Sequence, residues 1–131
     1  MLSFRDPDGL LLEIVTHPRA RDRPSWGGVP NVPPEHAIHG FHSVTLWVTD
    51  PTATRMLLTN ELGFHSDMND GSQERFVVAS GEPAQIVNVR TVGEFVRGTE
   101  GGGTIHHVAW EVPDERDFGP ITERLSGASA K

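Results

Sequence analysis

Histidine and carboxylate side chains are the groups in this sequence that could carry metal or acid–base chemistry. The chain contains seven His and 18 Asp and Glu, but no Cys. A disulfide framework, a thiolate zinc site and a cysteine nucleophile are therefore excluded, and a metal would need imidazole and carboxylate ligands. His107 and Glu13 are the two side chains whose surroundings favour this role, which depends on the elements that position them.

His107 lies in a segment with the pattern of a β-strand. Residues 104–112 are rich in β-branched and aromatic residues, and Phe118, Ile121 and Leu125 then follow at helical spacing. Side chains alternate between the two faces of a strand. This places His107 on a face with both polar and apolar residues, which suits the lining of a cavity, whereas His106 falls on the apolar face that a helix would cover. His107 is therefore a candidate ligand, and the alternative is an ordinary hydrogen-bonded strand histidine.

Glu13 follows a turn signal near the start of the chain. Asp6-Pro7-Asp8-Gly9 between apolar stretches predicts a hairpin, because Pro fixes one turn residue and Gly accepts positive φ. On the second strand Glu13 shares a face with Leu11 and Val15. A carboxylate in that position is either solvated at a sheet edge or held by a partner such as a metal.

The middle of the chain predicts one complete structural unit. Residues 41–49 read as a strand and 51–62 as a helix that Asp50 caps and Gly63 ends, and strands are expected at 64–68, 75–79 and 84–90. Trp47 falls on the strand face opposite the covering helix. It could stack on an aromatic ligand there, or fill an interface between units.

The same pattern recurs 64 residues later in the chain. Four identities occur at this offset, and they pair His42 with His106, Val44 with Val108, Val48 with Val112 and Asp50 with Asp114. A duplicated unit divides the chain into a hairpin of a preceding module (1–16), a connector with five prolines (17–37), a complete βαβββ module (38–92) and the first strand and helix of a following module (93–131). The predicted fold is α+β, with mixed, curved sheets that form a cup.

Three stretches carry a resemblance to a known superfamily. Residues 4–14, the unit 40–90 and the run Gly103-Thr104-Ile105-His106-His107-Val108-Ala109-Trp110 resemble the vicinal-oxygen-chelate superfamily of glyoxalases, bleomycin-resistance proteins and extradiol dioxygenases. The order of hairpin, connector and the two strand motifs is similar to the middle portion of a ring-cleaving dioxygenase of the hydroquinone type.

The resemblance implies a metal and a substrate. Such enzymes hold Fe(II), or sometimes Mn(II), with two His and one carboxylate, and an aromatic diol or hydroquinone meets O₂ there. His107 matches one of the two His ligands, and Glu13 matches the carboxylate ligand of smaller members, whereas Ser43 stands where a metal-binding module has His. A glyoxalase-like lyase or isomerase with Zn or Ni, and a drug-sequestering module without catalysis, are the alternatives.

Composition limits the remaining choices. A chain of 131 residues makes one modest domain, and its net charge of −7 argues against a nucleic-acid partner. No apolar run reaches the roughly 20 residues of a membrane helix, and the first residues lack a signal-peptide core, which favours a cytoplasmic protein. The two partial modules are expected to pair, within one chain or in a homodimer, and so to bring His107 and Glu13 onto one concave surface.

Overall fold

A computed structural model describes residues 1–28, 30–78, 83–93, 101, 104–112 and 114–129. Along the chain a hairpin and a connector precede a strand, a helix and three further strands, and a second helix closes the order. The turn expected around 80–83 and the glycine-rich run 98–104 lie largely outside the described residues. None of the helices in the described part is long and apolar enough to span a bilayer.

The predicted βαβββ unit forms a four-stranded mixed sheet. Its strands are β3 (Ser43–Val48), β4 (His65–Asn69), β5 (Gln73–Val77) and β6 (Ile86–Thr91), in the spatial order β3-β6-β5-β4. β3 runs parallel to β6, and the other neighbours are antiparallel. The α+β class and the module type are therefore confirmed, and each strand starts within two residues of its predicted position.

The helix of this unit begins and ends at the predicted signals. α1 (Thr52–Met56) continues as one π-helical turn, η3 (Leu57–Glu61). The Asp50 carboxylate accepts a hydrogen bond from the Thr52 amide at 2.9 Å. Gly63 adopts φ +75°, which lets the Phe64 amide turn back and donate to the Leu58 carbonyl at 2.9 Å.

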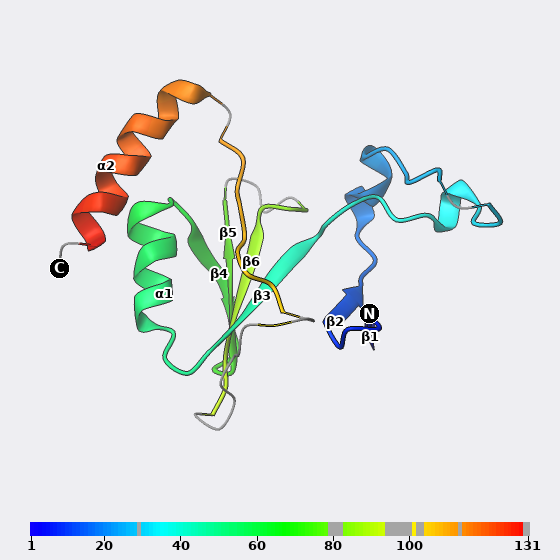
Figure 1. Ribbon diagram of the computed structural model, residues 1–131, viewed down its shortest axis with the longest axis horizontal. Helices are drawn as coiled ribbons and strands as arrows, with labels where there is room; N and C mark the ends of the chain where they lie inside the picture. The colour runs from blue at the N-terminus through cyan, green and yellow to red at the C-terminus, as the bar shows by residue number, and fades with distance from the viewer. Residues whose placement is uncertain (29, 79–82, 94–100, 102–103, 113, 130–131) are drawn as a thin grey trace.

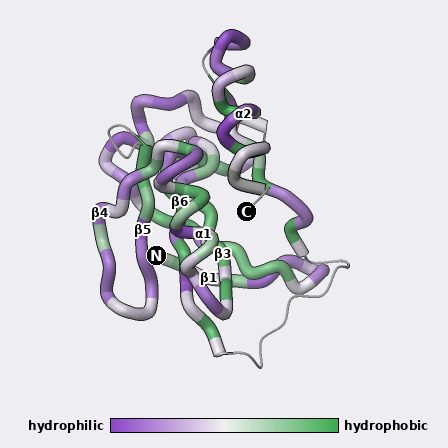
Figure 2. The backbone as a smooth tube through the Cα atoms, turned by 90° about the vertical axis from the view of Figure 1, so that its left-hand side faces the viewer, coloured by the Kyte–Doolittle hydropathy of each residue, from purple (hydrophilic) through white to green (hydrophobic). Residues whose placement is uncertain are grey.

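The core lies between this helix and one face of the sheet (Figure 1). Its buried residues are Leu58, Phe64, Phe76, Val87 and Val89, and Val44, Leu46 and Val48 pack against them. The face predicted for β3 is thus confirmed, and Figure 2 shows the hydrophobic stretches along β3 and β6 that make it. The opposite face carries polar side chains, among them Ser43, Thr45, Asn88 and Arg75 at neighbouring register positions.

The N-terminal hairpin forms a separate two-stranded sheet. β1 (Leu2–Arg5) pairs antiparallel with β2 (Leu11–Ile14). The Asp6 carboxylate accepts from the amides of Asp8 and Leu10, and Gly9 adopts φ +90°, as the turn signal predicted. The connector then forms two 3-10 turns, Pro18–Asp22 and Pro34–His36.

The strand predicted at 104–112 does not form. Among the described residues, this segment belongs to neither sheet, and the hairpin strands pair only with each other. The expectation that the two partial modules pair within one chain is therefore wrong, because a β-pattern makes a strand only where a neighbour supplies backbone partners. Pairing between two chains remains a prediction.

The helix predicted after this segment does form. α2 (Phe118–Ser129) follows the short 3-10 turn Glu115–Asp117 and packs near η3, where Arg124 donates to the Glu61 carbonyl at 3.2 Å. The Asp114 carboxylate accepts from the Arg116 amide at 2.8 Å. Asp50 makes the same contact two residues before its own helix, so this part of the internal repeat is structural.

Candidate functional site

A pocket of about 460 Å³ separates β3 from the extended segment that follows the glycine run. It is lined by residues 44–48 of β3 on one side and by Ile105, His106, His107, Val108 and Trp110 on the other. Trp110 also packs edge-on against the core residue Phe64, with ring centroids 5.8 Å apart. The volume lies in the range of small-molecule sites and is large enough to admit an aromatic ring.

His107 is exposed and lines this pocket. Its Nδ1 atom lies 3.2 Å from Nδ1 of His106, and the two rings are nearly perpendicular, at 85°. His106 was predicted to lie on the covered face, and that prediction is wrong. Strict alternation holds only in a pleated, ladder-bonded strand, and residues 104–112 do not form one.

Trp47 lines the same pocket from β3. Its side chain is 49% exposed, and the Arg90 guanidinium lies over its ring at 5.6 Å from the centroid. Arg90 is the direct register partner of Trp47 on β6. This cation–π contact fixes the indole at the edge of the polar face, where the sequence predicted it.

Hydrogen bonds link the polar side chains on that face. The Asn88 side-chain amide lies 3.5 Å from Ser43 Oγ and 3.4 Å from Thr45 Oγ1, and Ser43 Oγ also contacts His42 Nδ1 at 3.0 Å. The hydroxyl of Ser43 is therefore engaged by its protein neighbours, at the position where the resemblance implies a His ligand in a metal-binding module.

Sequence reasoning missed a pair of histidines beside this face. The rings of His17 and His42 lie 5.4 Å apart, because the connector folds back on the start of β3. The pKa of His42 is lowered by burial first, and then by the positive charges of His17 and Arg75. No local signal could reveal this contact, since the two residues are 25 positions apart and joined by an irregular segment.

Arg75 also holds the neighbouring carboxylate of Asp67. Its Nε and Nη2 atoms donate to the two carboxylate oxygens at 2.8 and 2.7 Å. Hydrogen bonding to Arg75 lowers the pKa of Asp67 and raises that of Arg75. The pair therefore stays ionised and fixes the polar face beside β4.

Glu13 lies elsewhere. It faces Ser3 across the hairpin, where the Ser3 hydroxyl donates to Glu13 Oε1 at 3.3 Å, and it does not line the pocket of His107. The described part of the chain contains no group of three or more His, Asp or Glu side chains that could hold a metal. The ligand roles of His107 and Glu13 remain predictions.

The donor set at the pocket only partly suits the metal that the resemblance implies. Two imidazoles are present, but no carboxylate lies among the described residues that line the pocket. A site with two histidines and one carboxylate therefore needs a further ligand from another part of the chain or from a second chain.

Comparison with known proteins gives the chemical context of this fold. The chain is 34% identical over 116 residues to MhqO of Bacillus subtilis, which is assigned as a ring-cleaving dioxygenase; the match covers 88% of this chain and 36% of MhqO. It is 31% identical over 116 residues to the chlorohydroquinone/hydroquinone 1,2-dioxygenase of Sphingobium indicum, covering 86% of this chain and 36% of that protein. No family model matches the sequence.

A solved structure agrees with these relatives. A Bacillus subtilis protein assigned as a dioxygenase superposes with a TM-score of 0.79 at 29% identity, over 95% of this chain and 39% of that one. The chain is thus related in sequence and fold to ring-cleaving dioxygenases, and it spans little more than a third of their length.

Proposed function

We propose that this chain is part of a metal-dependent ring-cleaving dioxygenase for catechol- or hydroquinone-like aromatics. The observation that carries the proposal is the match to the chlorohydroquinone/hydroquinone 1,2-dioxygenase, which extends over 86% of this chain. The position of His107 beside a pocket large enough to admit an aromatic ring supports it. The metal that the superfamily resemblance implies is Fe(II), with Mn(II) as the alternative.

The residues around the pocket have distinct roles in this proposal. Trp47, held by Arg90, offers a ring face for stacking, and Val44, Leu46 and Val108 provide apolar surface beside it. His107 would hold the metal through an imidazole nitrogen. When bound, such an ion supplies neighbouring coordination positions for the substrate oxygens and O₂.

A second copy of the chain would supply the missing carboxylate. The hairpin presents an exposed apolar face, made of Leu2, Phe4, Leu12 and Ile14 at paired register positions. Residues 104–112 have backbone groups that join no sheet. Glu13 lies on the opposite face of the hairpin, beside Ser3. In a homodimer, residues 104–112 of one copy would therefore pair along an edge of the other copy's hairpin, and Glu13 and His107 would share one face of the extended sheet while the apolar face is covered.

Elemental analysis of the full chain, purified without chelator, tests this proposal. We expect stoichiometric iron or manganese in the unmodified protein and its loss in both His107→Ala and Glu13→Ala. His36→Ala, in the connector, is the matched control and should keep the metal. Retention of the metal in His107→Ala would contradict the proposal.

A non-catalytic role as a binding module for small aromatics is the second candidate. It is favoured by Ser43, whose hydroxyl contacts His42 and Asn88 at the position where a metal-binding module of this superfamily has His. A metal-free protein that still binds hydroquinone, with binding that Trp47→Ala abolishes, would support this role over catalysis.

A further inference from the structure

A second pocket lies at the start of the connector. Its volume is about 410 Å³, and its lining residues are Thr16, His17, Pro18 and Arg21. It shares none of the described lining residues with the pocket beside β3. The volume lies in the range of sites for small organic molecules.

The polar side chains that line this pocket can all donate hydrogen bonds. Arg21 has the five N–H donors of its guanidinium, and Thr16 has a hydroxyl. The Arg19 amide donates to His17 Nδ1 at 3.2 Å, so the neutral His17 ring carries its proton on Nε2 and donates from there. No Asp or Glu is among the described residues that line the pocket. The chemistry of these groups favours an anionic ligand.

Arg21 is the charged member of this set. It lies on the same side of the 3-10 turn Pro18–Asp22 as Pro18, because side chains three residues apart eclipse in such a turn. Among the described residues, the Arg21 guanidinium makes no ion pair and no hydrogen bond. The neighbouring Asp22 carboxylate is instead paired with Arg19 Nε at 3.3 Å. Arg21 therefore presents an exposed, uncompensated positive charge at the pocket.

Contacts with the residues that precede β3 hold this turn at both ends. At its start, the rings of His17 and His42 lie 5.4 Å apart. At its end, the Arg23 guanidinium donates to the Phe41 carbonyl at 2.9 Å, and the Arg23 carbonyl oxygen lies 2.7 Å from His39 Nδ1. A site whose walls are held in place loses less conformational freedom when a ligand binds.

The local charge around the pocket is positive, although the whole chain carries a net charge of −7. Burial lowers the pKa of His42 first, and the positive charges of His17 and Arg75 lower it further. These groups attract an anion to this part of the surface. Because the chain as a whole repels a doubly charged anion more than a singly charged one, the balance favours a monoanion.

We propose that this pocket binds the carboxylate group of a small organic acid. The planar Arg21 guanidinium matches the two carboxylate oxygens, and Thr16 and His17 donate to their remaining lone pairs. The ring of Pro18 offers apolar surface to the rest of the ligand. The inference goes beyond the proposed function, because it concerns a different pocket, and it holds whether or not the chain takes part in ring cleavage.

Two-dimensional ¹H–¹⁵N spectra of the full chain, titrated with sodium benzoate at constant ionic strength, test this site. We expect saturable shifts of the backbone amides of residues 16, 17 and 19–22. Benzamide has nearly the same shape without the charge, and it should cause no saturable shift. Inorganic phosphate should bind more weakly than benzoate, because it carries more charge and has no apolar part.

Substitutions separate a specific contact from a general effect of charge. Arg21→Gln should weaken benzoate binding at least about tenfold, because it removes a charge-assisted bidentate contact. Arg21→Lys should restore only part of the affinity, since it keeps the charge and loses the planar fork. Arg116→Gln is the matched control, because Arg116 is also an exposed arginine on a 3-10 turn, and it should leave the affinity unchanged. Far-UV circular dichroism checks that each variant is folded.

Three results would overturn the proposal. Equal binding of benzoate and benzamide would show that the carboxylate is not recognised. Equal losses in Arg21→Gln and Arg116→Gln would show that benzoate responds only to the overall charge of the chain. Tighter binding of phosphate than of benzoate would contradict the assignment of an organic carboxylate.

Discussion

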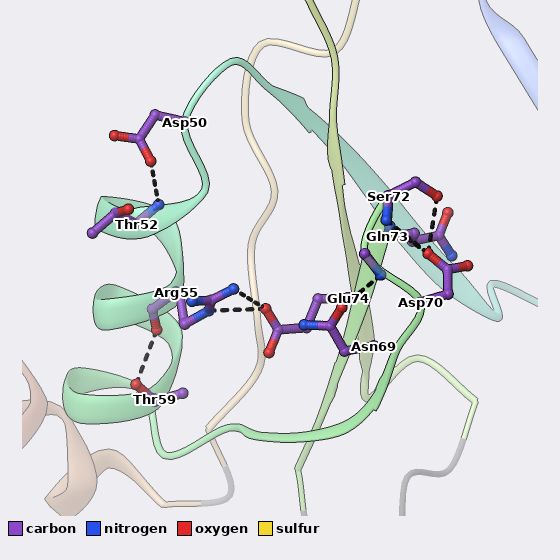
Figure 3. A network of polar contacts seen from close by, with 10 residues as sticks. Asp50, Thr52, Arg55, Thr59, Asn69, Asp70, Ser72, Gln73 and Glu74 are labelled. Carbon is purple, nitrogen blue, oxygen red and sulfur yellow. Dashed lines mark hydrogen bonds and ion pairs between the residues drawn. The ribbon is translucent and has the colours of Figure 1, made fainter.

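Glu74 is the buried acidic side chain of the described core, with 9% of the residue exposed. It points from β5 toward α1, where Arg55 Nε donates to its carboxylate at 2.8 Å and Arg55 Nη2 lies 2.6 Å from the same oxygen (Figure 3). A buried carboxylate that loses its partner keeps the cost of its lost hydration. Replacing Arg55 should therefore lower the stability of the fold.

We predict that Arg55→Met lowers the free energy of unfolding by about 1–3 kcal/mol, because it leaves Glu74 without its partner. Urea denaturation followed by circular dichroism measures the change. Arg55→Lys is the control and should lose less, since it keeps a positive charge. The double variant Arg55→Met/Glu74→Leu should recover much of the loss, and a double variant less stable than Arg55→Met would contradict this account.

The lowered pKa of His42 predicts that the stability of the fold depends on pH. Burial, His17 and Arg75 lower its pKa from the usual 6.5, so below pH 6.5 the unfolded chain binds more protons than the folded one. The stability that His42 contributes is fully present above pH 6.5 and is lost as the pH falls toward the depressed folded pKa. Urea titrations at pH 7.5 and 5.5 should show lower stability at the acidic pH.

His17→Asn should reduce that slope, since it removes one of the charges that lower the pKa of His42. His36→Asn serves as the control. The ion pair of Asp67 with Arg75 affects stability in a different pH range. A carboxylate with a lowered pKa loses its contribution to folding stability only as the pH falls below about 3.8. A pH profile that is identical in His17→Asn would show that His17 does not act on His42.

At the scale of elements, the helix end at Gly63 depends on a left-handed backbone conformation. Gly63 has φ +75° with open space around it, so an added side chain would be strained by its backbone and not by a clash. We predict that Gly63→Ala costs about 1–2 kcal/mol of stability. Gly127→Ala, in α2 and also in open space, should instead stabilise slightly. Equal effects of the two substitutions in thermal unfolding would contradict this reading.

The sequence patterns predicted the elements that local chemistry determines. Asp50 and Gly63 mark the ends of the first helix, Asp6 and Gly9 make the hairpin turn, and Val44, Leu46 and Val48 face the core as alternation required. Each of these features depends on residues close together in the chain.

The predictions that proved wrong concern features that depend on partners distant in the chain. Residues 104–112 have the composition of a strand but pair with no strand in the described part of the chain. The side chains of His106 and His107 therefore do not alternate, and their rings contact each other. The packing of His17 on His42 likewise follows from the path of the connector. For the candidate site, His107 and Trp47 both line the pocket, and the roles predicted for them remain predictions. His106 was placed on the covered face, yet it lines the same pocket.

At the scale of the whole molecule, the exposed hairpin predicts self-association. Phe4 is 42% exposed on the apolar face of the hairpin, and Leu11 is 41% exposed on the opposite face. We expect the chain to form a dimer, measured by light scattering coupled to size exclusion, and Phe4→Lys to shift it toward the monomer. Leu11→Lys is the matched control, and dissociation by both variants alike, or a monomer at all concentrations, would contradict the hairpin interface.

The central claim is that the pocket between β3 and residues 105–110 holds both the metal and the aromatic ring. It is tested most directly by two-dimensional ¹H–¹⁵N spectra of the full chain, titrated anaerobically with Fe(II) and then with hydroquinone. The account predicts that Fe(II) broadens the resonances of residues 105–108 and of the Trp47 indole, and that hydroquinone shifts the Trp47 signal further. Broadening confined to the connector histidines, with no response of Trp47 to hydroquinone, would contradict it.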